Sequence, residues 1–182
     1  EEKFQYTYDI LNVKDFGVPQ NRRRLVLIAS KHGPVNLMEK TYGLKAKPYV
    51  TVRDVIFKYP PLSAGETNRG IPNHQCRTLS ILNLKRIRNI PKNGGSRTAL
   101  PKELVLKCHR GHNGHKDVYG RMRWDDVSPT LTCKCISISN GRFAHPEQDR
   151  GISIREAAAI QTFPDNYIFF GNMTDSTKWV GN

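Results

Sequence analysis

The sequence predicts an α/β fold in which a β-hairpin and a C-terminal helix flank an irregular, basic middle region. Three observations support this prediction. Residues 24–30 (RLVLIAS) form a short apolar run that is typical of a strand. Residues 153–164 (SIREAAAIQTFP) carry helix signals at both ends. The excess of positive charge lies almost entirely within residues 31–120.

The N-terminal segments suit two paired strands. Residues 6–16 (YTYDILNVKDF) are rich in β-branched and aromatic side chains. Gly17 and Pro19 lie in the link to the apolar run, so we expect a turn there and a hairpin around it. The apolar run has so few polar residues that we expect it to be covered on both faces, as in a larger sheet.

The middle region contains one clear helix signal within residues 79–91. An apolar stripe recurs there near helical spacing, and basic side chains lie outside it. The stripe consists of Leu79, Leu82, Ile87 and Ile90, and the basic residues are Lys85, Arg86 and Arg88. Residues 51–61 are expected to form one helical or extended turn, and residues 31–50 a loop.

The C-terminal helix has the clearest boundaries. Ser153 is expected to be the N-cap, and Glu156 three residues later completes a capping box. Pro164 is expected to stop the helix. Arg155 and Glu156 are therefore interpreted as structural. Residues 126–139 are expected to be extended.

The charge of the chain indicates a polyanionic partner. There are 29 Lys and Arg against 16 Asp and Glu, a net charge of +13 with a pI near 9.8. Residues 31–120 hold 17 of the basic and 5 of the acidic groups. This concentration favours phosphate contacts in the middle of the chain, and nucleic acid is the commonest such partner. A merely soluble basic protein is the alternative.

The cysteines and the N-terminus indicate the compartment. Residues 1–8 (EEKFQYTY) do not resemble a signal peptide, and no apolar run approaches the roughly 20 residues of a membrane span. We therefore expect no membrane association, a reducing cytoplasmic compartment and free thiols. Cys133 and Cys135 are interpreted as small core residues on one strand face.

A zinc site is the weaker interpretation of the Cys and His residues in the middle region. The candidate ligands are His74, Cys76, Cys108, His109, His112 and His115. Cys and His are the usual zinc ligands, but this spacing is not that of a standard finger. We expect loop histidines and no metal site.

An arginine cluster stands at the start of the second strand. Alternation along an extended chain puts Gln20, Arg22 and Arg24 on one side and Arg23 on the other. Two forked guanidiniums and an amide suit a planar ligand with several acceptors, such as a phosphate or a base edge. A solvated strand end is the alternative from spacing alone.

Four elements in a fixed order point to one family. These are PQNRRR (19–24), SPTLT (128–132), HPEQDRGISIREAAAIQTFP (145–164) and the terminal GN (181–182). Together they resemble the C-terminal half of the C5-cytosine DNA methyltransferases. The resemblance implies a fragment of the methyltransferase Rossmann-like sheet with a small, irregular α+β target-recognition lobe.

The resemblance also implies a division of the chain and an incomplete enzyme. Residues 1–30 and 119–182 would belong to the catalytic domain, and residues 31–118 to the target-recognition domain. The family's nucleophile is the cysteine of a Pro-Cys dipeptide, and no proline precedes a cysteine here. The glycine-rich cofactor loop is also missing. We therefore expect a fragment or split subunit that is inactive without its N-terminal catalytic half.

For the site, the resemblance implies base flipping and methyl transfer from S-adenosylmethionine to duplex DNA. Arg24 would reach O2 of the flipped cytosine, Arg22 would hold phosphate or brace the pocket, and Gln20 would support both. Gly181 and Asn182 would line the cofactor pocket.

DNA contacts are expected from the basic region. The candidates are Arg23, Lys85, Arg86, Arg88, Ser96, Arg97, Lys107 and Arg110. Gly94 and Gly95 would allow a close backbone approach to the DNA. The implied setting is a bacterial restriction–modification system, with the protein near the nucleoid. A stand-alone DNA-binding or regulatory module is the alternative function, and a zinc-stabilised RNA-binding protein is a weaker one.

Overall fold

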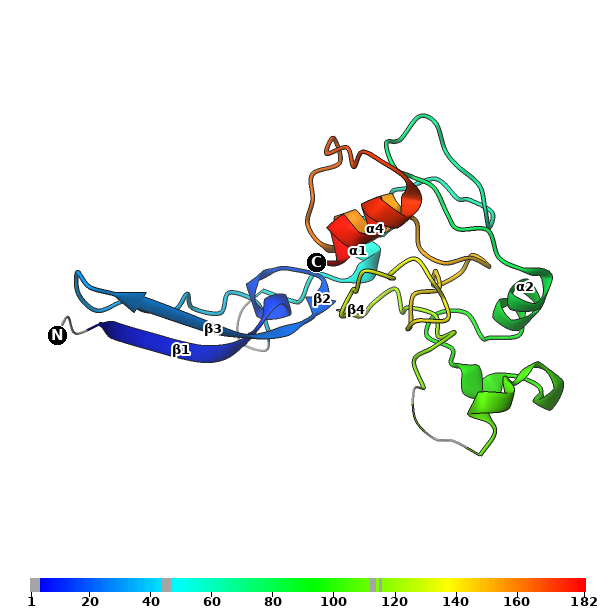
Figure 1. Cartoon of the computed structure of the whole chain (residues 1–182), viewed down its shortest axis with the longest axis horizontal. Coiled ribbons are helices and arrows are strands. Elements are labelled where there is room, and N and C mark those ends of the chain that lie inside the picture. Colours follow the sequence, from blue (N-terminus) through cyan, green and yellow to red (C-terminus); the bar gives the residue numbers. More distant parts are fainter. Residues whose placement is uncertain (1–3, 44–46, 112–113, 115) are drawn as a thin grey trace.

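The molecule is a long two-stranded ribbon attached to a rounded body (Figure 1). The computed structural model describes residues 4–43, 47–111, 114 and 116–182. The first strand starts at the far tip of the ribbon, and the C-terminus lies where the ribbon meets the body.

The ribbon is the predicted hairpin. Strand β1 (Gln5–Asn12) pairs antiparallel with β3 (Arg23–Ser30), in a register that runs from Gln5 opposite Ser30 to Asn12 opposite Arg23. A 3₁₀ turn, η1 (Val13–Phe16), follows β1, so the first strand ends four residues earlier than predicted. Gly17 follows this turn with φ of 88°, a conformation that glycine adopts without strain.

The prediction that both faces of the ribbon are covered is wrong for the described part of this chain. Tyr6, Tyr8 and Ile10 on β1 are 62–66% exposed, and Leu25 and Leu27 on β3 are 59–66% exposed. These side chains share one face, because each lies an even number of residues from the next and the register pairs Tyr8 with Leu27. The ribbon thus presents an apolar face that the body does not cover.

A second, very short sheet joins the ribbon to the body. Strand β2 (Gln20–Asn21) pairs in parallel with β4 (Ser128–Pro129), and the Thr130 hydroxyl donates to the Asn21 carbonyl over 2.6 Å. The extended conformation predicted for 126–139 holds only around β4. Turns follow it, because Cys135 N donates to Thr132 O and the chain reverses there.

The cysteine interpretation is therefore half right. Cys135 is fully buried, as expected of a small core residue, but Cys133 is exposed. Their side chains do not share a strand face because the chain turns between them. All four cysteines are free thiols in the structure.

In its described residues the body contains the α-helices α1 (Val52–Ile56), α2 (Ile81–Arg88), α3 (Ile154–Ile160) and α4 (Met173–Gly181). Short 3₁₀ turns η2 (Arg97–Ala99), η3 (Lys102–Leu104) and η4 (Lys107–His109) lie between α2 and β4. The predicted helix within 79–91 and the capping box of α3 are both confirmed.

Two helix details differ from the sequence prediction. Helix α3 ends at Ile160, before Pro164, because Thr162 takes a positive φ of 65°. Helix α4 was not predicted; its N-cap Asn172 accepts from the backbone N–H of Asp175.

Two hydrophobic cores support the body. The larger core packs α1, α3 and Val180 of α4 together with Trp124 and Leu131. The smaller core surrounds Ile87 and Ile90. Each core takes residues from both predicted ranges, 31–118 and 119–182, and the division into two domains stays a prediction.

Buried ion pairs and arginine–carbonyl bonds hold the irregular segments. Arg150 and Glu156 form a two-bonded pair with N···O distances of 2.7 Å, and neither side chain is more than 1% exposed. Arg155 is fully buried and donates to the carbonyls of Pro72, Pro164 and Tyr167. The structural roles predicted for Arg155 and Glu156 are confirmed.

Within the described residues, none of the helices has both the length and the apolar character needed to cross a membrane.

Replacing Glu156 with Gln should lower the free energy of unfolding by about 3–5 kcal/mol, because the Arg150 charge would remain buried without its partner. Urea unfolding of the chain measures this difference. The matched control is Arg53→Gln, which breaks the exposed Arg53–Asp125 pair and should change stability little. Equal effects of the two substitutions would contradict a role for the buried pair.

The pH dependence of the free energy of unfolding should reveal that His145 is buried in its neutral form. Burial lowers the pKa of His145 from 6.5 to about 3, and Nδ1 accepts from the backbone N–H groups of Glu147 and Gln148. Below pH 6.5 the unfolded chain takes up a proton that the folded chain rejects, so stability falls as the pH falls from 6.5 toward 3.

The slope should be about 1.4 kcal/mol per pH unit for this proton. The pKa of Glu156 is lowered to about 2, through its bonds to Arg150, from an ordinary 4.5. Glu156 therefore contributes in the same direction, but only below about pH 4.5. Urea unfolding between pH 6.5 and 4.5 isolates His145, and His145→Asn should flatten the curve there. An unchanged slope in that variant would refute the assignment.

Candidate functional site

The arginine cluster begins at a fully buried glutamine. The Gln20 side chain has no exposed surface. Its Nε2 donates to Gln161 Oε1 over 2.7 Å, and its Oε1 accepts from the Leu131 backbone N–H over 3.1 Å. Gln161 in turn donates to the Val180 carbonyl over 2.6 Å. One buried amide thus ties β2 to the segment after β4, to the end of α3 and to α4.

Arg22 binds the other side of the same peptide segment. Its guanidinium donates to the Leu131 carbonyl over 3.2 Å and to the Asn182 carbonyl over 3.3 Å. Its backbone N–H donates to Asn12 Oδ1 over 3.1 Å. Desolvation, followed by repulsion from the neighbouring Arg24 charge, lowers the pKa of Arg22 from its ordinary value. Arg22 is therefore a partly buried cation whose guanidinium is fixed by two backbone carbonyls.

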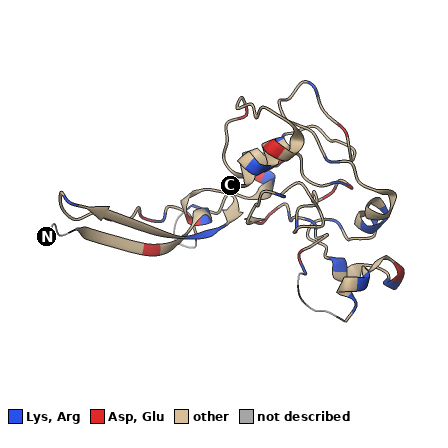
Figure 2. Cartoon of the chain, viewed as in Figure 1, with Lys and Arg blue, Asp and Glu red and all other residues tan. Residues whose placement is uncertain are grey.

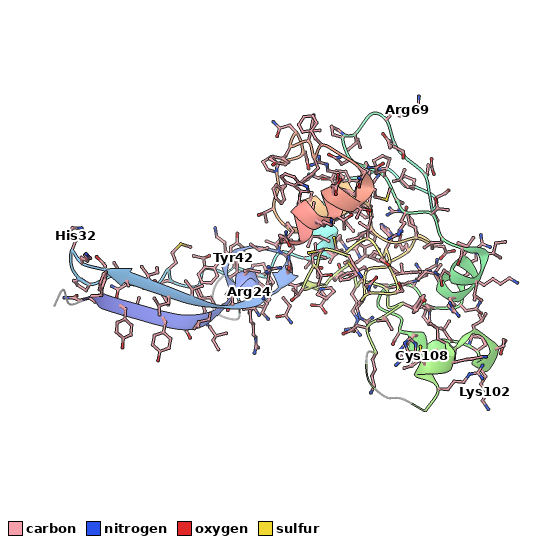
Figure 3. All side chains as sticks on the ribbon, viewed as in Figure 1. Arg24, His32, Tyr42, Arg69, Lys102 and Cys108 are labelled. Carbon is pink, nitrogen blue, oxygen red and sulfur yellow. The ribbon has the colours of Figure 1, made fainter. Side chains whose placement is uncertain are left out.

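Arg24 is exposed at the base of the ribbon, where Figure 3 labels it. Its guanidinium donates to the Arg23 carbonyl over 2.7 Å. The repulsion between Arg24 and Arg22 shows that the two charges are neighbours. A fixed cation beside an exposed one can bind an anion or a planar group with several acceptors. Figure 2 shows how few charges the rest of the ribbon carries.

The C-terminus closes one side of this site. Cys133 Sγ donates to Asn182 Oδ1 over 3.0 Å. Gly181 packs so closely on the preceding turn that an added Cβ would lie 2.3 Å from the Thr132 carbonyl carbon. Glycine is therefore needed at 181 for the packing of α4, and the exposed Asn182 lies at the edge of the arginine site.

Some of the residues predicted to contact DNA are exposed, and others are held by hydrogen bonds within the chain. Lys85, Lys107 and Arg110 are exposed, as is Arg23 at the ribbon base. Arg88 is also exposed and lies 3.9 Å from Asp149.

Arg86 is more constrained than its neighbours. Its guanidinium donates to the Leu104 carbonyl and to Asn83 Oδ1, both over 3.0 Å, and lies over the Tyr119 ring. Arg86 therefore binds α2 to the segment after it.

The loop at 92–97 is built differently from our expectation. An added Cβ on Gly95 would lie 2.1 Å from the Pro91 carbonyl oxygen, and one on Gly94 would lie 2.5 Å from the Arg123 side chain. An added side chain at either glycine would meet other parts of the chain, and their expected close approach to DNA stays a prediction. Arg97 is 7% exposed and donates to the Gly114 carbonyl, so a DNA contact would require it to leave that carbonyl. Ser96 donates to the Lys116 carbonyl over 3.0 Å.

The histidine and cysteine candidates have other partners. His74 is buried between Ser153 Oγ and the Pro60 carbonyl, both at 2.9 Å. Burial raises the pKa of the Cys76 thiol to about 12, which opposes the thiolate that zinc requires. His112 and His115 lie outside the described residues. Among the residues that the structure does describe, no group of three potential metal ligands converges.

Sequence reasoning missed Gln161, Leu131 and Cys133. Gln161 had a visible signal, since it is a polar amide directly after the buried apolar helix α3. Leu131 acts through its backbone, and Cys133 through a turn, and neither role leaves a sequence signal.

Comparison with known proteins gives the class of this mixed α/β chain. The family model for the C-5 cytosine-specific DNA methylases matches residues 1–182. The Type II methylase M.HgiDII of Herpetosiphon aurantiacus is 42% identical over 169 residues, covering 91% of this chain and 47% of that protein. The Type II methyltransferase M1.HphI of Haemophilus parahaemolyticus is 36% identical, covering 95% of this chain and 42% of that protein.

A solved structure agrees with the fold. A protein described as a DNA modification methyltransferase from an Escherichia coli prophage aligns with a TM-score of 0.62 at 18% identity, over 96% of this chain and 56% of that one. The chain belongs to the C-5 cytosine-specific DNA methylase family, and it spans about half the length of the two relatives named above.

Gly181→Ala should destabilise the chain by about 1–3 kcal/mol, because the new methyl group would overlap the Thr132 backbone, which cannot move aside as a flexible side chain does. Thermal unfolding measures the loss. Gly70→Ala is the control, since its nearest neighbour is a side-chain oxygen at 3.3 Å. Equal melting temperatures for the two variants would show that α4 does not pack as described.

Proposed function

We propose that this chain is the C-terminal half of an S-adenosylmethionine-dependent DNA cytosine-5 methyltransferase of a restriction–modification system, acting on specific sequences in duplex DNA. The observation that carries the proposal is the fixed Arg22 beside the exposed Arg24; Arg22 and buried Gln20 bind the same Leu131 peptide segment. The family match and the Type II relatives support this assignment.

The partner of this half would be the N-terminal catalytic half of the same enzyme. The relatives are about twice as long as the stretch they share with this chain. The exposed apolar face of the ribbon (Tyr6, Tyr8, Ile10, Leu25 and Leu27) needs a cover that the body does not supply. We expect the other half to pack on this face and to contribute the nucleophilic cysteine. Residues 1–30 and 119–182 would then complete the catalytic domain, and residues 31–118 would form the target-recognition domain.

In this proposal each arginine has a separate role. Cytosine must leave the helix to react, which costs a few kcal/mol, so the extruded base needs partners in a pocket. Arg24, which is exposed, would donate to O2 of the base. Arg22 would brace the pocket, because two backbone carbonyls already bind its guanidinium. Gln20 would hold Leu131, and through it Arg22, in place.

S-adenosylmethionine would supply the methyl group. Of the two residues expected to contact it, Gly181 is fixed by packing, whereas Asn182 is exposed beside Cys133 and has a side-chain amide that can line a cofactor pocket. These residues fit one wall of such a pocket, and the rest would lie on the other half. The enzyme would act in the bacterial cytoplasm, at the nucleoid, where its duplex substrate lies.

In the complete enzyme, Arg24→Ala should reduce turnover by about 100-fold or more while weakening duplex binding only modestly, because the contact forms on the extruded base. Transfer of tritiated methyl groups to duplex DNA measures turnover, and filter binding measures affinity.

Arg69→Ala is the control, since Arg69 is an exposed cation on the loop between α1 and α2, away from the arginine site (Figure 3). Retained turnover in the Arg24 variant would refute its role. Robust methyl transfer by residues 1–182 alone would refute the claim that the nucleophile lies on the other half.

A further inference from the structure

A groove outside the arginine site has no assigned role. It has a volume of about 710 Å³ and lies between the turn at 133–140, helix α4 and residues 77–83. Its polar lining includes Arg77, Lys134 and Lys178 together with Asn83, Ser137 and Asn140.

The groove is positively charged. Arg77, Lys134 and Lys178 are exposed. None of the described residues that line it is acidic. The nearest carboxylate on α4, Asp175, lies 3.9 Å from Lys178. Arg77 and Lys134 therefore face the groove without an acidic residue among its lining side chains, which favours a phosphate ligand.

The floor of the groove is rigid and presents hydrogen-bonding side chains. Cys135, Ile136 and Ile138 are at most 3% exposed and anchor the turn in the core. The intervening residues face outward, and the hydroxyls of Ser137 and Ser139 lie 3.1 Å apart. Asn140 is exposed at the end of the turn. An amide held on a fixed turn can donate to and accept from one base edge.

The groove borders the arginine site at Cys133. Cys133 lines the groove and donates to Asn182, whose carbonyl accepts from Arg22. A ligand that reached Arg24 would therefore extend into this groove if it were as long as a few nucleotides. A polyanion that combines phosphates with base edges fits both ends of this surface.

We propose that the groove holds the duplex next to the flipped base, with Arg77 and Lys134 on phosphates and Asn140 reading a base edge. This assignment rests on the proposed function, because it takes duplex DNA as the ligand. It adds the residues that set affinity and sequence preference, none of which lies in the arginine site.

The experiment uses the complete enzyme. Selection of duplexes from a random-sequence pool by binding to the wild type defines the target, and two duplexes are then made, one with the target and one with a single base pair changed. Lys134→Ala should weaken binding to both duplexes alike and reduce the slope of log K against log salt by about 1. Lys134→Arg should restore the slope.

Asn140→Ala should leave the salt slope unchanged and reduce the discrimination between the two duplexes by roughly 5- to 150-fold. Arg69→Ala is the matched control, since Arg69 is an exposed cation on the loop between α1 and α2, away from the groove (Figure 3).

A salt slope for Lys134→Ala equal to that of the Arg69 control would overturn the phosphate contact. Unchanged discrimination in Asn140→Ala would overturn the base contact. If the Lys134 and Asn140 variants change duplex binding as predicted but the wild type transfers no methyl group, the proposed activity fails and the groove assignment is supported.

Discussion

The structure depends on the way one buried peptide segment is held from two sides. Leu131 donates its N–H to Gln20 and accepts at its carbonyl from Arg22, so the start of β3 and the end of the body are fixed to each other. Because Gln20 is fully buried, losing either partner would leave a buried polar group unpaired, at a cost of about 1–3 kcal/mol. This constraint, more than the short β2–β4 sheet, fixes where the arginines can point.

Regular secondary structure is sparse throughout the body. Its helices are short, and long irregular segments are held by fully buried arginines that donate to backbone carbonyls: Arg121 binds Ile87 and Ile90, and Arg155 binds Pro72 and Pro164. Such segments can carry many exposed basic side chains, because their backbone is fixed from within. The ribbon is the exception, since it projects away from the body (Figure 1) and its apolar side chains are exposed. The chain spans about half the length of the relatives it matches.

The sequence predicted the features that depend on local chemistry. The hairpin followed from a segment rich in β-branched and aromatic residues, an apolar run and the link with Gly17 and Pro19, and α3 from its capping box. The features that depend on contacts between residues far apart in the sequence could not be predicted from it. Arg97 donates to the Gly114 carbonyl, Gly95 packs against Pro91, and Gly94 packs against the Arg123 side chain. Of the candidate site, Gln20, Arg22 and Arg24 were predicted from alternation along one extended segment, which the structure divides between β2 and β3, and their roles stay a prediction. Leu131 could not be predicted, because it acts only through its backbone.

The most direct test of the central claim is a crystal structure of the complete enzyme bound to duplex DNA that carries its target sequence. The account predicts a cytosine outside the helix with its O2 within hydrogen-bonding distance of the Arg24 guanidinium, and Arg22 still bound to the Leu131 carbonyl. A structure with an extruded cytosine held by other residues, and with Arg24 facing solvent, would contradict it.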